Sequence, residues 1–516
     1  MSASQETLSA DTPLQEYDER HAGSRSTVVH TSSCETLQNE YVTGPLEETF
    51  LEKTCEGVSD LPKNGHPSSL AVPSKRGPRF WRALRLTFFS YYRRLFTLVF
   101  TTNLAVLVAL AVRSRGVASI STLSHVSTAS SVNLTVAVVF RHEHLVNLLF
   151  VVFGSIPVSA PLCIRRTLAK VFHYGGLHSG CGVATVCWFL LYAALVTRGF
   201  IIRDPAVIRE EPAIIVITYV LLTLLLGIVV FAHPRFRHLA HNSFEAVHRF
   251  AGWMGVVLLW IHTVIVANAF RKAQPGQSLG KFLVTIPPFW LLLITTLSII
   301  YPWIHLRKVA VRPEYLSGHA VRLHFDYAAS RVSLCTALRV SDNPLKEWHV
   351  FATIPEAQGT TSFSLLVSHA GDWSHRIIRN PPTKLWVRGV PTSGFLRCAI
   401  MFQRVVIVAT GSGIGPVLSL MTGRPNLSCR ILWSTRHPQS TYGSAVMNAV
   451  LRADHDAMII DTNATGRPDL VGLAYQLYVN YDAEAVFVIS NPASTRKVVY
   501  GMESRGIPAY GPIWDS

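Results

Sequence analysis

The feature that most constrains this chain is a series of long apolar segments between residues 85 and 305. Each approaches the roughly 20 residues that a helix needs to cross a lipid bilayer. We place six of them, near residues 88–112, 143–163, 178–197, 213–232, 246–268 and 284–304. Charged residues make up 15% of the 516 residues. Because a soluble domain carries about 25%, this composition argues against a wholly soluble or disordered protein.

The basic residues crowd beside the apolar segments, which is typical of membrane-flanking charge rather than of a nucleic-acid footprint. Six spans put both termini on one side, and the short basic loops near 165–170, 235–237 and 307–308 fall on that side. We therefore expect an integral membrane protein with cytosolic termini, in the plasma membrane or an internal membrane, with the lipid bilayer as partner and no nucleic acid. The sequon at Asn133 would lie outside, which predicts a glycoprotein.

Composition and the pattern of apolar residues divide the chain into four parts. Residues 1–74 hold 12 Asp and Glu against 4 Lys and Arg, which predicts a disordered, acidic cytosolic tail. A six-helix membrane domain should occupy 75–308. Alternating apolar segments over 309–400 predict an antiparallel β-barrel, and residues 401–516 alternate buried strands with helices, as in an α/β nucleotide-binding domain. The eight cysteines are scattered without a CxxC pair, so neither a disulfide framework nor a zinc site is indicated.

Histidines inside apolar segments suggest a metal or haem site, because an ionisable side chain is costly in a membrane. His248 and His262 are fourteen residues apart, which is about 21 Å of helix and close to four full turns. Both therefore share one helical face, as two stacked haem sites would require. His178 should lie level with His248, and Tyr192 level with His262, so one bis-histidine site is expected while the second stays open. The alternative is a pair of hydrogen-bonded histidines that pack the bundle.

A glycine-rich loop follows the apolar strand near residue 405 and opens a helix. Its glycines would let backbone N–H groups approach a pyrophosphate at the helix N-terminus. The loop comprises Gly411, Ser412, Gly413, Ile414, Gly415 and Pro416. The alternative is a tight turn without a ligand. After the next strand, Arg436 is positioned to pair with a 2′-phosphate, which favours NADPH over NADH.

Taken together, these motifs resemble the ferric reductase and NADPH oxidase superfamily. The phrases HYGGLHSGC and FEAVHRFAGW bring the chain nearest to fungal TmpA-type integral membrane oxidoreductases. The resemblance implies a ferredoxin-reductase-like cytosolic half with FAD and NAD(P)H sites. It implies that flavin is held by His349, Phe351, Thr353, Gly371 and Ser374, and that Ser490 and Trp514 lie near the reacting nicotinamide and flavin. The turn 389–394 is similar to a glycine turn of the family.

Two hypotheses follow from the resemblance. The first is an enzyme that moves electrons from NADPH through FAD to a membrane haem b, and on to a small-molecule or metal-ion acceptor, in fungal development or specialised metabolism. The second is a degenerate, non-catalytic membrane protein that acts in signalling or as a scaffold. Val350, Ser368, Ser490 and Tyr192 depart from the family pattern and favour the second. The sequence does not identify the acceptor, the pathway, the number of haems or the oligomeric state.

Overall fold

The computed structural model describes residues 71–115, 119–202, 212–272, 276–326, 333–357 and 361–513. The chain divides into two units, Met1–Ser68 and Ser69–Ser516. The first unit lies outside the described residues, and with it nearly all of the predicted acidic tail. All of the described helices and strands belong to the second unit.

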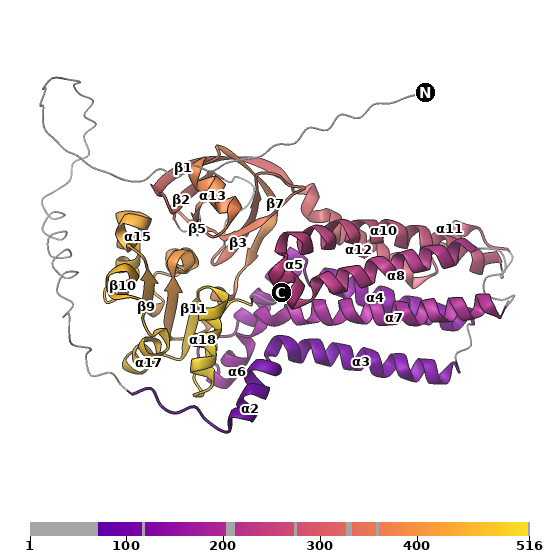
Figure 1. Cartoon of the computed structure of the whole chain (residues 1–516), viewed down its shortest axis with the longest axis horizontal. Coiled ribbons are helices and arrows are strands. Elements are labelled where there is room, and N and C mark those ends of the chain that lie inside the picture. The colour runs from indigo at the N-terminus through magenta and orange to yellow at the C-terminus, as the bar shows by residue number, and fades with distance from the viewer. Residues whose placement is uncertain are drawn as a thin grey trace, which may run out of the picture. The chain divides into compact units, whose positions relative to one another are not determined.

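The N-terminal half of this unit is helical (Figure 1). Its helices are α2 (Arg79–Ala83), η1 (Leu84–Phe88), α3 (Tyr91–Arg113), α4 (Ile120–Val139), α5 (Glu143–Gly154), α6 (Leu162–Leu168), η2 (Val171–Tyr174), α7 (Gly175–Ile201), α8 (Pro212–Ala232), α9 (Pro234–Leu239), α10 (His241–Lys272), α11 (Leu279–Leu283) and α12 (Pro287–Ile304). Helix α7 is the centre of the bundle, because it contacts α3, α4 and α8 and contributes Trp188, Phe189 and Tyr192 to the core. By contrast, no residue of α3 is buried.

Five helical segments of the described chain are long and apolar enough to cross a membrane. They are α3, the stretch Leu162–Ile201, α8, α10 and α12. The pair α4 and α5, bent by 72°, would add a sixth. The second predicted span is therefore misplaced: residues 143–163 contain the short helix α5 and the first residues of α6, and α5 reaches the length and apolarity of a span only together with α4. Helix α4 was not predicted as a span because its many Ser and Thr residues lower its apolar content.

The sequon at Asn133 lies in the middle of α4, where its side chain is buried. Its Nδ2 donates to Oδ1 of Asn103 at 2.7 Å and to the carbonyl of Ala129 at 2.9 Å. Trp188 Nε1 donates to the same Asn103 oxygen at 2.9 Å. A sugar cannot be attached to an amide packed between helices, so the glycoprotein prediction is wrong.

A seven-stranded antiparallel sheet follows the helices. Its strands are β1 (Arg307–Ser317), β2 (Ala320–Asp326), β3 (Thr336–Ser341), β4 (His349–Ala352), β5 (Ile354–Pro355), β6 (Ser362–Ser368) and β7 (Lys384–Ser393), in the order β4-β3-β7-β1-β2-β6-β5. Helix α13 (Asp372–Arg379) packs Trp373 and Ile377 into its core. The edge strands β4 and β5 are separated in sequence only by Thr353, so the sheet curls strongly.

The C-terminal part contains a five-stranded parallel sheet in the order β10-β9-β8-β11-β12. Its strands are β8 (Arg404–Thr410), β9 (Ser428–Thr435), β10 (Met458–Asp461), β11 (Ala485–Ile489) and β12 (Ala509–Tyr510). The helical segments are η3 (Phe395–Met401), η4 (Gly411–Gly413), α14 (Ile414–Gly423), α15 (Pro438–Ala453), α16 (Thr462–Thr465), α17 (Leu470–Asn480) and α18 (Pro492–Glu503). Every residue of β11 is buried, as expected for a parallel strand covered on both faces.

The predicted fold class, a six-span bundle followed by a flavin-binding barrel, is corrected in two respects. Five single helices and one bent pair replace six regular spans. The antiparallel sheet is open, because within the described residues no ladder joins β4 to β5. At the break, Thr353 turns inward: its N–H donates to the Thr336 carbonyl at 2.9 Å, and its hydroxyl bonds to Thr336 Oγ1 at 2.8 Å. The predicted domain limits 75–308, 309–400 and 401–516 stay predictions.

Candidate nucleotide-binding site

The glycine-rich loop lies at the carboxyl end of β8, the central strand of the parallel sheet. From β8 the chain passes first to β9 and β10 on one side and later to β11 and β12 on the other. The end of β8 is thus the point where the strand order reverses, which is where open α/β sheets bind ligands. Gly411 begins the loop with a φ of +53°, and its carbonyl accepts a hydrogen bond of 3.0 Å from Trp433 Nε1.

One glycine of the loop, Gly413, allows a close approach to a neighbouring strand, whereas Gly415 lies where a Cβ would make only ordinary contacts. A Cβ on Gly413 would lie 2.4 Å from the carbonyl oxygen of Ile489 at the end of β11, so no other residue fits without moving that strand. A Cβ on Gly415 would lie 3.6 Å from Leu366 Cβ and 3.9 Å from Ile354 Cδ1. The loop therefore packs between the parallel sheet and strands β5 and β6 of the antiparallel sheet.

The start of this helix has no side-chain cap, a property that it shares with α15. The N-termini of α17 and α18 are capped by Asp469 and Asn491, which accept hydrogen bonds from backbone amides. No side chain caps η4 or α14. The first amides of a helix have no partner within it, and together with the helix dipole they attract anions. This arrangement suits a pyrophosphate.

Two hydroxyl groups face each other beside the loop. Thr410 Oγ1, at the end of β8, lies 2.6 Å from Ser490 Oγ, directly after β11. Thr495 holds the Ser490 backbone by donating to its carbonyl at 2.9 Å. The sequence singled out Ser490 but not Thr410, since adjacency across parallel strands is not visible in the chain.

Tyr442 of α15 is a further loop neighbour that the sequence did not indicate. It is buried, its ring is tilted against that of Trp433 with the centroids 5.4 Å apart, and its hydroxyl lies 3.5 Å from where a Cβ on Gly411 would be. Burial raises the pKa of Tyr442 to about 12, against hydrogen bonds with Thr435 and Ser368 that lower it. Its hydroxyl therefore stays protonated, and it links β9 to β6.

Arg436 is exposed directly after β9. Burial lowers the pKa of His319, and the positive charges of His369 and Arg436 lower it further. The rings of His319 and His369 are 6.0 Å apart. The predicted 2′-phosphate residue thus lies near two histidines, His319 and His369, that belong to the antiparallel domain.

The residues predicted for flavin contact one another. His349 stacks on Trp373 at 4.2 Å, and Phe351 stacks on the same ring at 5.6 Å. At the start of α13, Ser374 Oγ accepts hydrogen bonds from the amides of Ala370 at 2.8 Å and Gly371 at 3.0 Å. The two amides therefore converge on one point, which the Ser374 hydroxyl occupies.

The turn 389–394 is filled by α5. Glu143 is buried there, with ion pairing to Arg339 and a hydrogen bond of 3.1 Å from the Val390 amide. Asn147 accepts from the Ser393 amide at 2.7 Å and donates to the Pro391 carbonyl at 3.0 Å. This turn joins helix and sheet and leaves no room for a ligand at Gly389.

In the bundle, the rings of His178 and His248 are 6.3 Å apart, and His178 Nδ1 lies 2.8 Å from the Ala137 carbonyl oxygen. His262 Nε2 lies 3.1 Å from Thr218 Oγ1, and its ring is 5.3 Å from that of Tyr192. Among the described residues, no three His, Cys, Asp or Glu side chains gather as a metal site. Trp514 lies outside the described residues.

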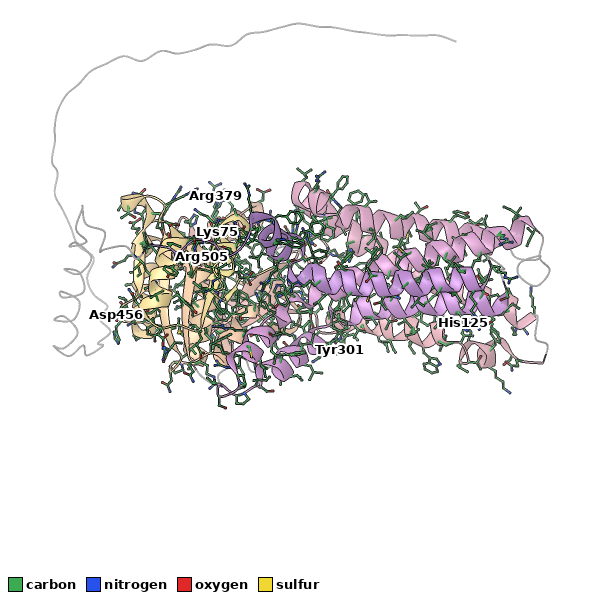
Figure 2. The ribbon with its side chains drawn as sticks, turned by 90° about the horizontal axis from the view of Figure 1, so that it is seen from below. Lys75, His125, Tyr301, Arg379, Asp456 and Arg505 are labelled. Carbon is green, nitrogen blue, oxygen red and sulfur yellow. The ribbon has the colours of Figure 1, made fainter. Side chains whose placement is uncertain are left out.

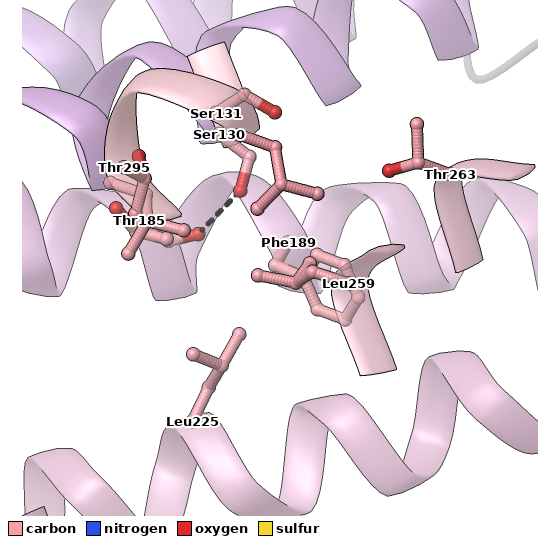
Figure 3. Close-up of a pocket in the computed structure, with 10 residues that line it drawn as sticks. Ser130, Ser131, Thr185, Phe189, Leu225, Leu259, Thr263 and Thr295 are labelled. Carbon is pink, nitrogen blue, oxygen red and sulfur yellow. Dashed lines mark hydrogen bonds between the residues drawn. The ribbon is translucent and has the colours of Figure 1, made fainter. Parts of the chain in front are cut away.

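A small cavity of about 30 Å³ lies in the same bundle (Figure 3). Hydroxyl side chains from several helices line it, and Ser130 Oγ donates to the Thr185 carbonyl at 3.3 Å. Its volume suits a water molecule rather than a substrate. The bundle therefore offers no substrate-sized site here, and the nucleotide loop is the better candidate.

Fold and loop together define an α/β unit with a candidate nucleotide site, and comparisons with known proteins relate the chain to reductases. Residues 395–516 match the family described as adenylate-forming reductase 03009, C-terminal domain. Adenylate-forming reductase 03009 of Coprinopsis cinerea is 46% identical over 444 residues, which are 86% of this chain and 42% of that protein. Adenylate-forming reductase 06235 of the same fungus is 45% identical over 445 residues, again 86% and 42%. The chain thus spans about two fifths of these relatives.

Solved structures give only a distant likeness. An intact type IV self-sufficient cytochrome P450 monooxygenase is 17% identical with a TM-score of 0.33, over 40% of this chain and 28% of that one. Ferredoxin-NADP+ reductase from Plasmodium falciparum is 10% identical with a TM-score of 0.32, over 40% of this chain and 95% of that one. Scores this low support no argument about function.

These relatives overturn the expected kinship with ferric reductases and NADPH oxidases. With it falls the predicted function, electron transfer to a membrane haem, and the scaffold alternative tied to it. The comparisons lend no support to haem at His178, His248 or His262. Glycine loops and histidines at whole-turn spacing are short patterns that unrelated chains can share. The relatives are named reductases, which supports an oxidoreductase.

Proposed function

We propose that this chain is an NADPH-dependent oxidoreductase whose dinucleotide lies on the Gly411–Gly415 loop. One observation carries the proposal: an uncapped helix start lies at the strand-order reversal, with Gly413 pressed against Ile489. There the loop amides would bind the pyrophosphate. Thr410 and Ser490 would orient the nicotinamide through their paired hydroxyls.

Arg436 supports NADPH over NADH, because a guanidinium is suited to a 2′-phosphate. His319 and His369 lie beside this arginine and add polar side chains to the same surface. NADH lacks the 2′-phosphate and would gain nothing from these residues.

FAD is the second part of the proposal, and it stands on fewer contacts. The amides of Ala370 and Gly371 converge on one oxygen, a geometry that would suit a phosphate oxygen in place of the Ser374 hydroxyl. The nucleotide loop contacts Ile354, next to Thr353, so the predicted flavin strand adjoins it. NADPH supplies a hydride, and FAD, when bound, accepts it and passes the electrons on.

The relatives' name joins two activities, adenylate formation and reduction. This chain spans 42% of each relative, and residues 395–516 match the C-terminal domain of adenylate-forming reductase 03009, so we propose that this part carries the reducing activity in the name. We propose a small molecule as the electron acceptor.

We propose that the outward faces of the bundle contact lipid. Large apolar side chains are exposed on α3, α8, α10 and α12, and no residue of α3 is buried. Exposed apolar area of this extent is unfavourable in water. Extraction of membranes with alkaline carbonate tests this: retention in the pellet is expected, and release into the supernatant would contradict it.

The test of the enzymatic proposal is steady-state NADPH oxidation by the purified chain with ferricyanide as acceptor. We expect turnover that Gly413→Val abolishes. Gly182→Ala is the matched control, because nothing lies within 4 Å of an added Cβ there. Absence of turnover in folded protein, with or without added FAD, would contradict the proposal. Flavin released on denaturation tests FAD separately.

A further inference from the structure

A second, larger cavity of about 320 Å³ lies away from the nucleotide loop. Its walls come from three places: η1 and the start of α3, the segment from α6 to η2, and the end of α18 with β12. We call it the basic cavity. The residues that define it are Arg85, Arg94, Arg166, Lys170, Glu503 and Tyr510. Its volume falls within the usual range for small-molecule sites, roughly 300–1,000 Å³.

The charges of the basic cavity are unbalanced. Among its described lining residues, Glu503 is the only carboxylate, and Lys170 already pairs with it. The buried Nε of Arg166 has no hydrogen-bond partner within the described chain. Arg94 donates to the backbone carbonyls of Phe89 at 2.8 Å and of Arg85 at 3.3 Å, and no ion pair of Arg94 is seen within the described residues. A buried guanidinium N–H without a partner is costly, which favours an anionic ligand.

The walls of the basic cavity are held together by contacts outside it. The segment before α2 runs along the end of α18, where Arg76 N–H donates to the Ser504 carbonyl at 2.8 Å and Arg505 Nε donates to the Pro73 carbonyl at 2.7 Å. Figure 2 labels Lys75 and Arg505 in this region. The site is therefore preformed, so binding would require little ordering of the protein.

Two further contacts close the other walls. Tyr510 Oη donates to the Arg166 carbonyl at 3.1 Å, which joins β12 to α6. Tyr92 Oη bonds to Ser179 Oγ at 2.9 Å, which joins α3 to α7. Each of the three walls is thus fixed to another element of the fold.

We propose that the basic cavity binds a phosphate group. Arginine guanidinium groups are matched to phosphate by planar, paired N–H donors, and a lysine adds a point charge. The phosphate could belong to a soluble ester or to a lipid headgroup. The exposed apolar surface of α3 begins at the cavity's edge, so lipid chains could lie along the helix while the headgroup enters the cavity.

The test measures the thermal unfolding midpoint of the full chain in neutral detergent at constant ionic strength. The probes are inorganic phosphate, dihexanoyl phosphatidic acid and dihexanoyl phosphatidylcholine. A ligand that binds the folded state raises the midpoint in proportion to its occupancy. Saturable stabilisation by inorganic phosphate supports a soluble ester. Stabilisation by phosphatidic acid alone supports a lipid headgroup.

The variant is Arg85→Gln with Arg94→Gln, two exposed positions whose change should leave the fold intact. We expect it to weaken binding of the effective probe at least tenfold. Arg93→Gln is the matched control, because this exposed arginine does not line the cavity. Two results would overturn the proposal: no probe stabilises the wild-type chain, or the control weakens binding as much as the double variant.

Discussion

The loop at Gly411 and the turn at Gly389 have glycines with positive φ, +53° and +70°, yet their surroundings differ. Both fall in motifs of the family that the sequence resembles. Around Gly411–Gly415 the helix start has no side-chain cap, and the hydroxyls of Thr410, Ser490 and Tyr442 lie beside the loop. At Gly389 the space that a Cβ would take is filled by the Glu143 carboxylate. One glycine motif is thus open to the proposed ligand, and the other is filled by a side chain of a helix.

The largest effect is expected at the loop. Gly413→Val places a side chain where the Ile489 carbonyl lies 2.4 Å from a Cβ, and it blocks the approach of a pyrophosphate. We expect loss of NADPH oxidation to below detection, measured at saturating nucleotide. Because this substitution also displaces the Ile489 carbonyl, circular dichroism and the thermal unfolding midpoint, measured beside Gly182→Ala, must show that the variant is folded before the loss is assigned to the nucleotide. A variant that keeps its turnover would show that the two glycine turns do not differ in this way.

The next largest effect is a loss of stability at the turn 389–394, which is filled by α5. Glu143→Ala leaves Arg339 and the Val390 amide without their buried partner, which should cost about 3 kcal/mol. Hydrogen exchange of the Val390 and Ser393 amides should accelerate accordingly. Asp456→Ala, which removes an exposed partner of Arg430, is the control and should change stability by less than about 0.5 kcal/mol. If the Val390 and Ser393 amides exchange at the same rate in Glu143→Ala and in Asp456→Ala, the turn does not join the helix to the sheet.

A smaller effect should follow from removing the positive charge of Arg436, which lies directly after β9. Arg436→Gln should raise the KM for NADPH by about tenfold, the worth of one charge-assisted hydrogen bond, and leave the KM for NADH unchanged. Side-by-side kinetics with both nucleotides measure this. Parallel changes for the two nucleotides would mean that Arg436 does not read the 2′-phosphate.

The smallest effect concerns how stability depends on pH at the contact between Glu484 and Arg165. Glu484 accepts hydrogen bonds from Arg165 at 2.8 and 3.0 Å, and these hold its pKa below the ordinary 4.5, although burial opposes them. Because the folded-state pKa is lowered, this stabilisation is complete above 4.5 and is lost as pH falls through the folded value. Glu484→Gln should cost about 1 kcal/mol at neutral pH. The difference from wild type should shrink as pH falls below 4.5 through the folded value, and a difference that does not shrink over this range would contradict the account.

Local order in the chain was visible in its sequence, and long-range partners were not. The apolar run before Gly411 and the glycines after it predict a strand, a loop and a helix, because each depends on neighbouring residues. Thr410 and Ser490 meet only through the pairing of β8 with β11, which no local pattern encodes. Nor could Glu143 be foreseen at Gly389, since 246 residues separate them. The charged residues at the start of the predicted span 143–163 were the one sign in the sequence that α5 does not face lipid along its whole length.

In the bundle, the spacing of the histidines correctly indicated which side chains lie side by side, but it misled us about their function. The fourteen-residue spacing brings His248 beside His178 and His262 beside Tyr192. The function inferred from this arrangement came from resemblance alone, and the relatives contradict it. Hydroxyl-rich α4 escaped notice because its Ser and Thr side chains bond within the bundle, as Thr135 does to Thr295 at 3.0 Å.

Equilibrium binding of NADPH to the purified chain, followed by the fluorescence of the reduced nicotinamide, tests the central claim most directly. The account predicts saturable binding of one NADPH per chain, weaker binding of NADH, loss of binding in Gly413→Val and retention in Gly182→Ala. Folded wild-type protein that shows no saturable binding, or a Gly413→Val variant that binds as wild type does, would contradict it.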